Sequence, residues 1–438
     1  MTPPTGTRRA LARTTAALPA AALLAACGQA TGSKPAETLA PVNLTWGQRA
    51  EPQYVSKEQL VIDVYNEKRP HITIERVAGI TTTTLLATLA AGTAPDTAWV
   101  EGADMPNVVT LGALVEVTKY WARDAKEINK DDFYPPVMDD VTWQGKLWGT
   151  SFGTAPHQPV YNKDAFTRFS LPTPGELAEK GQWTMDGMVD LMRRATNREG
   201  GGRPVQYGLL PLSNLVGTVM WLRANGGDVL NADRTQVTLD TPTNAETIQS
   251  MVDLRWKHRV WPTADEIAAL GQQRNIQSGA IGMEWFWHGG ANNLRDTNAF
   301  EWDVVPNPKG KVTTTAVVKG NGEVILKGSK QEEEGWQWIK HIASKEGDAA
   351  LVKSGRTIHR RKSTEALFNK EFHPPAGTKW IVAAYNQGKI LPLVPAWTEF
   401  NRIWNEVMGP VWNNAVTVRS ALTETHRQMQ AAMAATAR

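Results

Sequence analysis

The chain has 438 residues, 47 of them basic and 44 acidic, and its net charge of +3 arises from three arginines within the first 26 residues, which hold no acids. The remaining body is formally neutral and has no basic stripe, which argues against nucleic acid as a partner. A single cysteine excludes a disulfide within the chain, and this length exceeds one hydrophobic core, so two lobes are expected.

The first 26 residues have the layout of an export signal. Arg8, Arg9 and Arg13 give a positive start, residues 16–26 are apolar, and small residues precede Cys27. The apolar run is too short to span a bilayer. Leu24 to Cys27 resembles the lipobox of bacterial lipoproteins, which implies an acylated Cys27 and anchoring to the outer face of the cell membrane. Because Thr7 to Leu11 also resembles a twin-arginine signal, the export route stays open.

Residues 30–41 are small, polar and contain proline, so they predict a flexible tether, and the folded body is expected from Val42. Hydrophobic periodicity then alternates between two and 3.6 residues. It predicts strands at 42–46, 72–77 and 97–100 and helices at 55–68 and 81–91, the second with Gly92 just beyond its end. This alternation requires parallel strands joined by right-handed crossovers, and therefore an open α/β sheet.

In such sheets ligands bind beyond the carboxyl ends of the strands. That rule nominates Gly47, Gln48 and Arg49 after the first strand. It also nominates Glu101, Gly102 and Asp104 after the third. Ordinary solvated loops are the alternative for both groups.

Later segments continue the α/β pattern. A hairpin is predicted at 143–149, and helices are predicted after Asp164 and Thr184, which are expected to cap them. Further helices are predicted at 244–259, 332–344 and 416–435, with strand material at 317–326 interrupted by Gly320-Asn321-Gly322.

Short motifs in this order resemble the extracellular solute-binding protein family 1, the maltose-binding-protein-like receptors of carbohydrate-importing ABC transporters. They are the segments at 44–46, 65–77, 90–96, 112–114, 132–135, 145–149, 161–166, 225–227, 277–283 and 336–347. Each motif is only a turn or a cap signal, whereas the ordered set is specific and covers almost the whole body.

The resemblance implies two α/β lobes with open, mostly parallel sheets, a hinge between them, and ligand enclosed between the lobes. The first lobe would hold residues 42–152 and about 304–344, and the second 153–303 and about 345–438. It further implies a carbohydrate ligand, permease subunits of an ABC transporter as partners, no cofactor, and a monomer.

Tryptophan supplies 18 of the aromatic residues, against 7 tyrosines and 9 phenylalanines. Most of these indoles are expected in the core, but a subset on loops would suit the apolar face of a sugar ring. The stacking candidates are Trp221, Trp285, Trp287 and Trp397, and the polar candidates are Arg49, Asp96, Glu101, Glu284, His288, Asn321 and Arg356.

Several of these candidates have competing interpretations. Trp221 fits a helical core equally well, Asp96 fits a cap or turn after Pro95, and Arg356 could pair with an acid. Two departures from the family pattern also matter. The segment Glu284 to His288 offers two tryptophans where the family has one, and the segment after Arg356 lacks the usual proline.

Motifs typical of catalysis or of metal binding are incomplete in this sequence. Gly149 to Gly153 fits a nucleophile elbow around Ser151, but prolines follow where the elbow needs a helix. The eight histidines lack the paired spacing of a metal site. The leading hypothesis is therefore a non-enzymatic receptor. The alternatives are an extracytoplasmic glycoside-processing enzyme, or the same fold binding a polyol or glycerol phosphate.

Overall fold

The computed structural model describes residues 39–197, 205–270, 276–287, 294, 300–314, 316–371 and 376–436. Contacts divide the chain into residues 1–40 and a second unit, Pro41–Arg438, which is the subject of the following paragraphs. The predicted signal, Cys27 and nearly all of the predicted tether lie outside the described residues.

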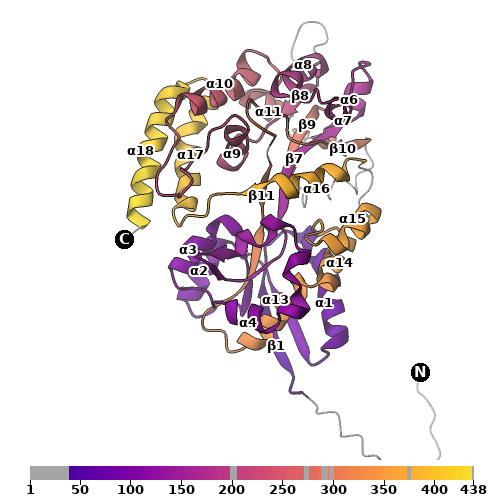
Figure 1. The fold of residues 1–438 in the computed structure, drawn as a ribbon, viewed down its shortest axis with the longest axis vertical. Coiled ribbons are helices and arrows are strands. Elements are labelled where there is room, and N and C mark those ends of the chain that lie inside the picture. Colours follow the sequence, from indigo (N-terminus) through magenta and orange to yellow (C-terminus); the bar gives the residue numbers. More distant parts are fainter. Residues whose placement is uncertain are drawn as a thin grey trace, which may run out of the picture. The chain divides into compact units, whose positions relative to one another are not determined.

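The first sheet has the strand order β2-β1-β3-β12-β6. Its strands are β1 (Val42–Gly47), β2 (Ile72–Val77), β3 (Thr97–Glu101), β6 (Thr150–Ser151) and β12 (Asn321–Ile325). The parallel pairing predicted for the first three strands is confirmed. β12 returns from far along the chain and runs antiparallel to β3 and β6, and in Figure 1 it is the orange strand among the indigo and purple ones.

Helices from both ends of the chain pack on this sheet. They are α1 (Pro52–Lys68), α2 (Thr82–Ala90), α3 (Met105–Thr110), α4 (Thr118–Arg123), α5 (Ala125–Ile128), α13 (Glu332–Ala343), α14 (Lys345–Lys353) and α15 (Glu365–Glu371). The core between sheet and helices is aromatic: Trp338 of α13 lies edge-on to Trp46 at 5.0 Å and to Tyr65 at 5.1 Å between ring centroids. Many of the tryptophans therefore lie in the hydrophobic core.

The second sheet has the order β13-β11-β7-β9-β8, with β10 also pairing with β7. These strands are β7 (Ala155–Asn162), β8 (Tyr207–Leu210), β9 (Ile281–Trp287), β10 (Trp302–Val304), β11 (Val317–Lys319) and β13 (Lys389–Ile390). β8 and β13 run parallel to their neighbours, whereas β9, β10 and β11 run antiparallel to β7.

The helices packed on the second sheet are α6 (Asp164–Thr167), α7 (Pro174–Glu179), α8 (Met185–Ala195), α9 (Leu215–Ala224), α10 (Pro242–Trp256), α11 (Ala264–Leu270), α16 (Thr378–Gln387), α17 (Trp397–Trp412) and α18 (Val418–Thr436). Thr184 caps α8 through the amide of Gly187, as predicted. The predicted cap at Asp164 is wrong: Asp164 is the first residue of α6, and Asn162 Oδ1 accepts its backbone N–H instead.

The two-lobe α/β class is as predicted, but within it the sheets are mixed rather than mostly parallel. The reason is that the chain crosses between the sheets and returns in the opposite direction. One crossing joins β6 to β7 through Thr154, and another joins β11 to β12 through Gly320. A Cβ at Gly320 would lie 2.0 Å from Thr154 Oγ1, so these two crossings run side by side with no room for a side chain.

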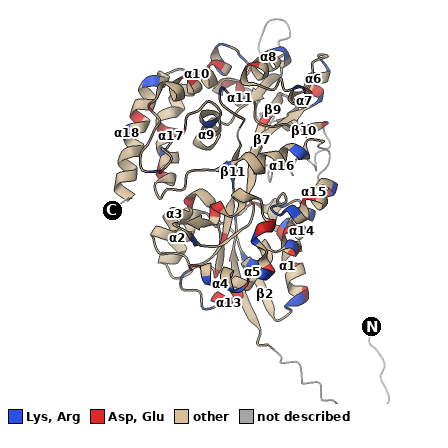
Figure 2. Ribbon diagram, in the orientation of Figure 1, with Lys and Arg blue, Asp and Glu red and all other residues tan. Residues whose placement is uncertain are grey.

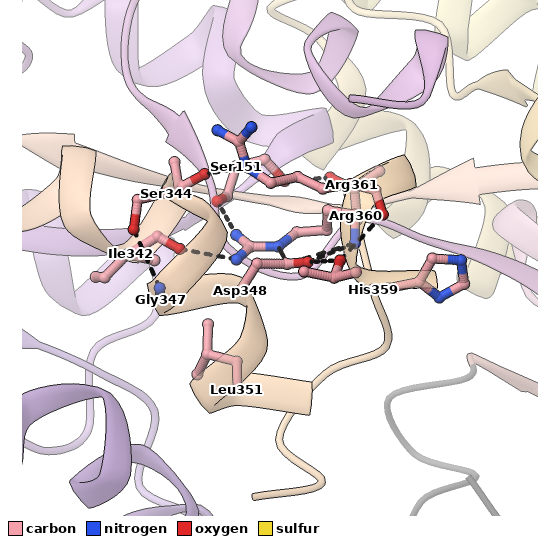
Figure 3. A network of polar contacts seen from close by, with 12 residues as sticks. Ser151, Ile342, Ser344, Gly347, Asp348, Leu351, His359, Arg360 and Arg361 are labelled. Atoms are coloured by element: carbon pink, nitrogen blue, oxygen red, sulfur yellow. Dashed lines mark hydrogen bonds and ion pairs between the residues drawn. The ribbon is translucent and has the colours of Figure 1, made fainter. Parts of the chain in front are cut away.

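A third connection carries the chain from α15 to α16. Before it, the segment between α14 and α15 is held by buried arginines. Figure 3 shows Arg360 bonded to Asp348 and to the carbonyl oxygens of Ser151 and Ile342. Its Nε lies 2.6 Å from Asp348 Oδ1, and both side chains are almost fully buried. α14 also packs on α1 and α13. Residues 345–371 thus contact the helices of the first sheet, although the sequence places 345–438 in the second lobe.

Charge is distributed evenly over this body. Figure 2 shows blue and red residues interspersed along the helices, without a one-signed stripe. None of the helices in the described ranges combines the length and apolarity that crossing a membrane would take.

Candidate functional site

A pocket lies where the carboxyl ends of β1 and β3 meet the start of β12. Its volume is about 110 Å³, and its lining residues are Arg49, Tyr54, Trp99, Glu101, Lys319, Asn321 and Arg356. Four of the polar side chains predicted from the sequence, Arg49, Glu101, Asn321 and Arg356, are therefore brought together. They come from the edge of the sheet at which ligands of α/β proteins bind.

The turn after β1 brings Arg49 to this edge. A Cβ at Gly47 would lie 2.8 Å from Pro95 and 2.9 Å from Ile80, so only glycine fits where the strand ends. Arg49 then pairs with Glu51, the residue before α1, at 2.5 Å, and its guanidinium lies 5.4 Å from the Trp99 ring centroid. Nearly half of the Arg49 side chain remains exposed, so it is available to a ligand.

Glu101 and Asn321 are fixed by the pairing of β3 with β12, in which they stand opposite each other. Glu101 forms an ion pair with Lys319, which ends β11. With its amide oriented to satisfy its neighbours, Asn321 accepts from Trp99 Nε1 at 3.2 Å and donates to the Gly320 carbonyl at 3.0 Å. The pocket thus includes the crossing between the two sheets.

Arg356 forms the buried wall of the pocket. Its Nε donates to Glu58 Oε1 at 2.7 Å, and its guanidinium lies 4.0 Å from the centroid of Tyr54. Glu58 also accepts from Arg76 at 2.6 Å. The ion pair considered from the sequence is therefore present, and the same guanidinium still lines the pocket.

A buried carboxyl lies beneath Gln48, beside this edge. Glu323 accepts from Trp46 Nε1 at 2.8 Å and from Gln48 Nε2 at 2.7 Å. Burial raises the pKa of Glu323 to about 8, although these two bonds oppose the shift. The carboxyl is therefore mostly protonated at neutral pH.

The other predicted site residues lie elsewhere. Asp96 is at the opposite end of β3, where it accepts from the backbone and hydroxyl of Thr45 and from Ser329. Trp221, Trp285 and Trp397 are each only 2% exposed and belong to the core of the second sheet. Trp285 Nε1 is bonded to Asn307 Oδ1 at 2.8 Å. Their ring faces are covered by protein rather than presented to a ligand.

Glu284 lies on β9, where it accepts the backbone N–H of Ile276 at 3.1 Å, and burial raises its pKa to about 7. β9 ends at Trp287. The Trp287 side chain and His288 lie outside the described residues.

The edge of the first sheet is also joined to α17 of the second lobe. Asp104 Oδ1 accepts from Thr398 Oγ1, and Asp104 Oδ2 accepts from Thr82 Oγ1, both at 2.7 Å. Thr398 lies in the first turn of α17. Asp104, nominated by its place after the third strand, therefore lies where the two lobes touch.

Sequence reasoning missed Tyr54, Trp99 and Lys319. Trp99 precedes Glu101 by two residues on the same strand, so the two side chains point to the same face of the sheet. This alternation of side chains along a strand could have identified Trp99 from the sequence. Lys319 adjoins the predicted Gly-Asn-Gly interruption. Tyr54 lies in the first turn of α1, and nothing in its spacing distinguishes it from a surface aromatic.

The pocket offers cations, a carboxylate, an amide and two aromatic rings, which is a set of hydrogen-bonding groups suited to polar ligands. Ser151, at the centre of the elbow-like motif, is buried on β6 with its hydroxyl 2.9 Å from Thr154 Oγ1, and the chain continues into β7 rather than a helix. Within the described ranges, no group of histidine, cysteine or acidic side chains has the arrangement of a metal site.

The sequence and the fold are both similar to those of known proteins. A family model described as bacterial extracellular solute-binding protein matches residues 61–374. The fold is similar to that of an ABC substrate-binding protein from Listeria monocytogenes in complex with cycloalternan, at 18% identity and a TM-score of 0.80, covering 90% of this chain and 99% of that chain.

Two further structures resemble it to a similar degree. Maltose-bound MalE3 of T. maritima has 17% identity and a TM-score of 0.74 over 89% of this chain and 99% of that one. A solute-binding protein from Agrobacterium radiobacter in complex with ribitol has 21% identity and a TM-score of 0.74 over 90% of this chain and 99% of that one.

Proposed function

The chain belongs to the bacterial extracellular solute-binding protein family, and we propose that it is the receptor of an ABC importer, binding a carbohydrate between its lobes and delivering it to a membrane permease. The observation that carries the proposal is the convergence of Arg49, Glu101, Lys319 and Asn321 beside Trp99 at the carboxyl edge of the first sheet. Charged and amide groups bond hydroxyls, and the Trp99 indole forms part of the wall beside them.

The ligands of similar structures favour the same chemical class. Cycloalternan, maltose and ribitol are all polyhydroxylated and uncharged. In the pocket, each cation already has a carboxylate partner: Arg49 has Glu51, Lys319 has Glu101, and Arg356 has Glu58. A neutral polyhydroxy ligand therefore fits this balance better than a phosphate ester, which would want unpaired cations.

The pocket supplies only part of the proposed site. Its volume of about 110 Å³ is smaller than a ligand pocket of roughly 300–1,000 Å³. We assign the remaining contacts to the facing lobe, where β9 ends at Trp287 and His288 follows. Trp221, Trp285 and Trp397 would then support that lobe from its core rather than stack on the ligand.

We also propose revised lobe boundaries. Residues 42–152 and about 320–371, which include β12, would form the first lobe, because α14 packs on α1 and Arg356 pairs with Glu58. Residues 155–318 and about 378–436 would form the second. The hinge would consist of the crossings at Thr154 and Gly320 and the segment before α16.

The receptor is proposed to be monomeric and held at the outer face of the membrane through acylated Cys27 and the tether that follows it. Two acyl chains anchor a protein far more firmly than one. Changing Cys27 to Ala should move the protein from the membrane fraction to the soluble fraction when cells expressing it are fractionated. Continued partitioning with membranes would contradict the anchor.

Catalysis is not part of the proposed function. A thermal-shift screen of saccharides, polyols and phosphate esters tests the function as a whole. A ligand present at ~100 times its Kd stabilises the folded state by ~2.7 kcal/mol. At least one neutral saccharide or polyol should raise the melting temperature and be recovered unchanged. A shift only with phosphate esters, or turnover of the saccharide, would contradict the proposal.

A further inference from the structure

A second cavity lies against the second sheet and is lined only by residues between 158 and 387. Its volume is about 250 Å³, and it shares no lining residue with the pocket at the edge of the first sheet. No strand of the first sheet contributes a residue to its lining.

The cavity arises where the second sheet is interrupted. β10 pairs with β7 at Val160 to Asn162, and β11 pairs with the same side of β7 at Ala155 and Pro156. Val305 still donates its backbone N–H to the Pro159 carbonyl of β7, and beyond it the chain leaves the sheet until β11. α16 covers the gap with Ala383 and Ala384, whose side chains are too short to fill it.

Two tryptophans form walls of this cavity, and hydrogen bonds hold the chain around them. Trp183 Nε1 donates to the Pro306 carbonyl at 2.7 Å, and the Trp183 carbonyl accepts from the backbone N–H of Lys309 at 3.0 Å. The Trp380 carbonyl, on α16, accepts from Gln158 Nε2 at 3.0 Å. Hydrogen bonds therefore fix the Trp183 indole and hold the backbone of α16 beside the cavity.

The lining of the cavity carries a positive charge. Lys309 is the only formally charged residue among those that line the cavity, and its ammonium has no ion-pair partner in the described part of the chain. The pair Glu179–Lys379, which joins α7 to α16 beside the cavity, is already neutral. The Asn307 amide is also engaged, with Trp285 Nε1 and with the carbonyl of His157.

We propose that this cavity is a second ligand site, which takes a small aromatic carboxylate with its ring against Trp183 and Trp380 and its carboxylate at Lys309. A dry cavity of ~150 Å³ accommodates benzene, so this one suits a ligand of about ten non-hydrogen atoms. Apart from Lys309, the polar side chains of the lining are three amides and the Thr314 hydroxyl, so the ammonium is the group that favours an anion.

Titration calorimetry with phenylacetate tests the site, with the equally sized neutral phenylacetamide as the comparison ligand. The protein should bind phenylacetate with a Kd below about 1 mM, and phenylacetamide about tenfold more weakly, because only the carboxylate forms a charge-assisted bond. Lys309→Gln should weaken phenylacetate about tenfold and leave phenylacetamide unchanged. Lys327→Gln, on the exposed surface of the first lobe, is the matched control and should change neither.

A filling variant separates this cavity from any other site. Ala383→Leu places a larger side chain where α16 faces the cavity and should abolish the binding of both aromatic ligands while leaving carbohydrate binding intact. Absence of phenylacetate binding to the wild type at about 10 mM, or undiminished binding in Ala383→Leu, would overturn the proposal. Neither result bears on the carbohydrate site, so the two proposals fail independently.

Discussion

Glu323 shows how a single buried residue makes the stability of the fold depend on pH. Its pKa is about 8 in the folded protein, against a reference value of 4.5, because burial disfavours the carboxylate. Between these pH values the folded state keeps a proton that the unfolded chain releases. The folded state therefore binds more protons than the unfolded state, so this group makes the free energy of unfolding fall as pH rises from about 4.5 to about 8.

Replacing Glu323 with Gln removes that titration while preserving the shape of the side chain. Gln48 faces Glu323 with its Nε2, and its Oε1 has no hydrogen-bond partner among the described residues, so turning the Gln48 amide over lets Oε1 accept from the new amide. Relative to the wild type, the variant should gain ~2–4 kcal/mol in free energy of unfolding between pH 5 and pH 8. Urea denaturation at both pH values measures this change.

Glu116→Gln serves as the control for this experiment. The bond from Lys146 lowers the pKa of Glu116, so its titration lies below the measured range. The wild type and this variant should share one slope between pH 5 and pH 8. Parallel pH curves for Glu323→Gln and the wild type would show instead that Glu323 is ionised in the folded state.

At the residue scale, strand order accounts for why three of the polar candidates lie together. Arg49 follows β1, Glu101 ends β3 and Asn321 begins β12, and the pairing of β3 with β12 places the last two opposite each other. The tryptophans were harder to place, because burial and ligand stacking favour the same residue type. Trp285 and Trp397 could be assigned to the core only once their neighbours were known.

At the scale of elements, the packing of the segment between α14 and α15 depends on the buried pair of Arg360 and Asp348. Asp348 is held by α14, and Arg360 also bonds the Ser151 carbonyl next to the first crossing. Arg360→Met leaves a buried carboxylate without its cation and should cost ~3–5 kcal/mol in free energy of unfolding. Urea denaturation measures the loss.

Lys68→Met is the matched control, since Lys68 pairs with Glu346 on the same helix, with both side chains more than half exposed. An exposed pair contributes ~0–1 kcal/mol. Adding Asp348→Leu to Arg360→Met should recover part of the loss, because no buried charge is then left unpaired. Equal costs for Arg360→Met and Lys68→Met would contradict the structural role of this pair.

Element boundaries followed from the sequence more readily than element partners did. α13 begins at Glu332, and α8 begins after its Thr184 cap, as periodicity and capping predicted. Periodicity identifies the buried face of a helix but does not name the sheet that covers it. For this reason α14 and α15 were placed in the second lobe, although α14 packs on α1.

At the scale of the whole molecule, the two sheets have distinct functions in the proposed receptor. The first presents a polar pocket at its carboxyl edge, and the second contacts that edge through α17. Length and the single cysteine indicated two lobes stabilised by core burial, and the strand and helix order indicated the fold. Ligand identity could not be predicted, because it depends on how groups distant in sequence meet across the hinge.

The most direct test of the central claim is titration calorimetry of the purified protein with the saccharide or polyol that stabilises it most. One ligand should bind per chain, and Arg49→Gln should raise its Kd about 10–100-fold, because a charged donor to the ligand is lost. Lys327→Gln should leave the Kd unchanged. Wild-type affinity in Arg49→Gln would contradict a ligand site at the edge of the first sheet.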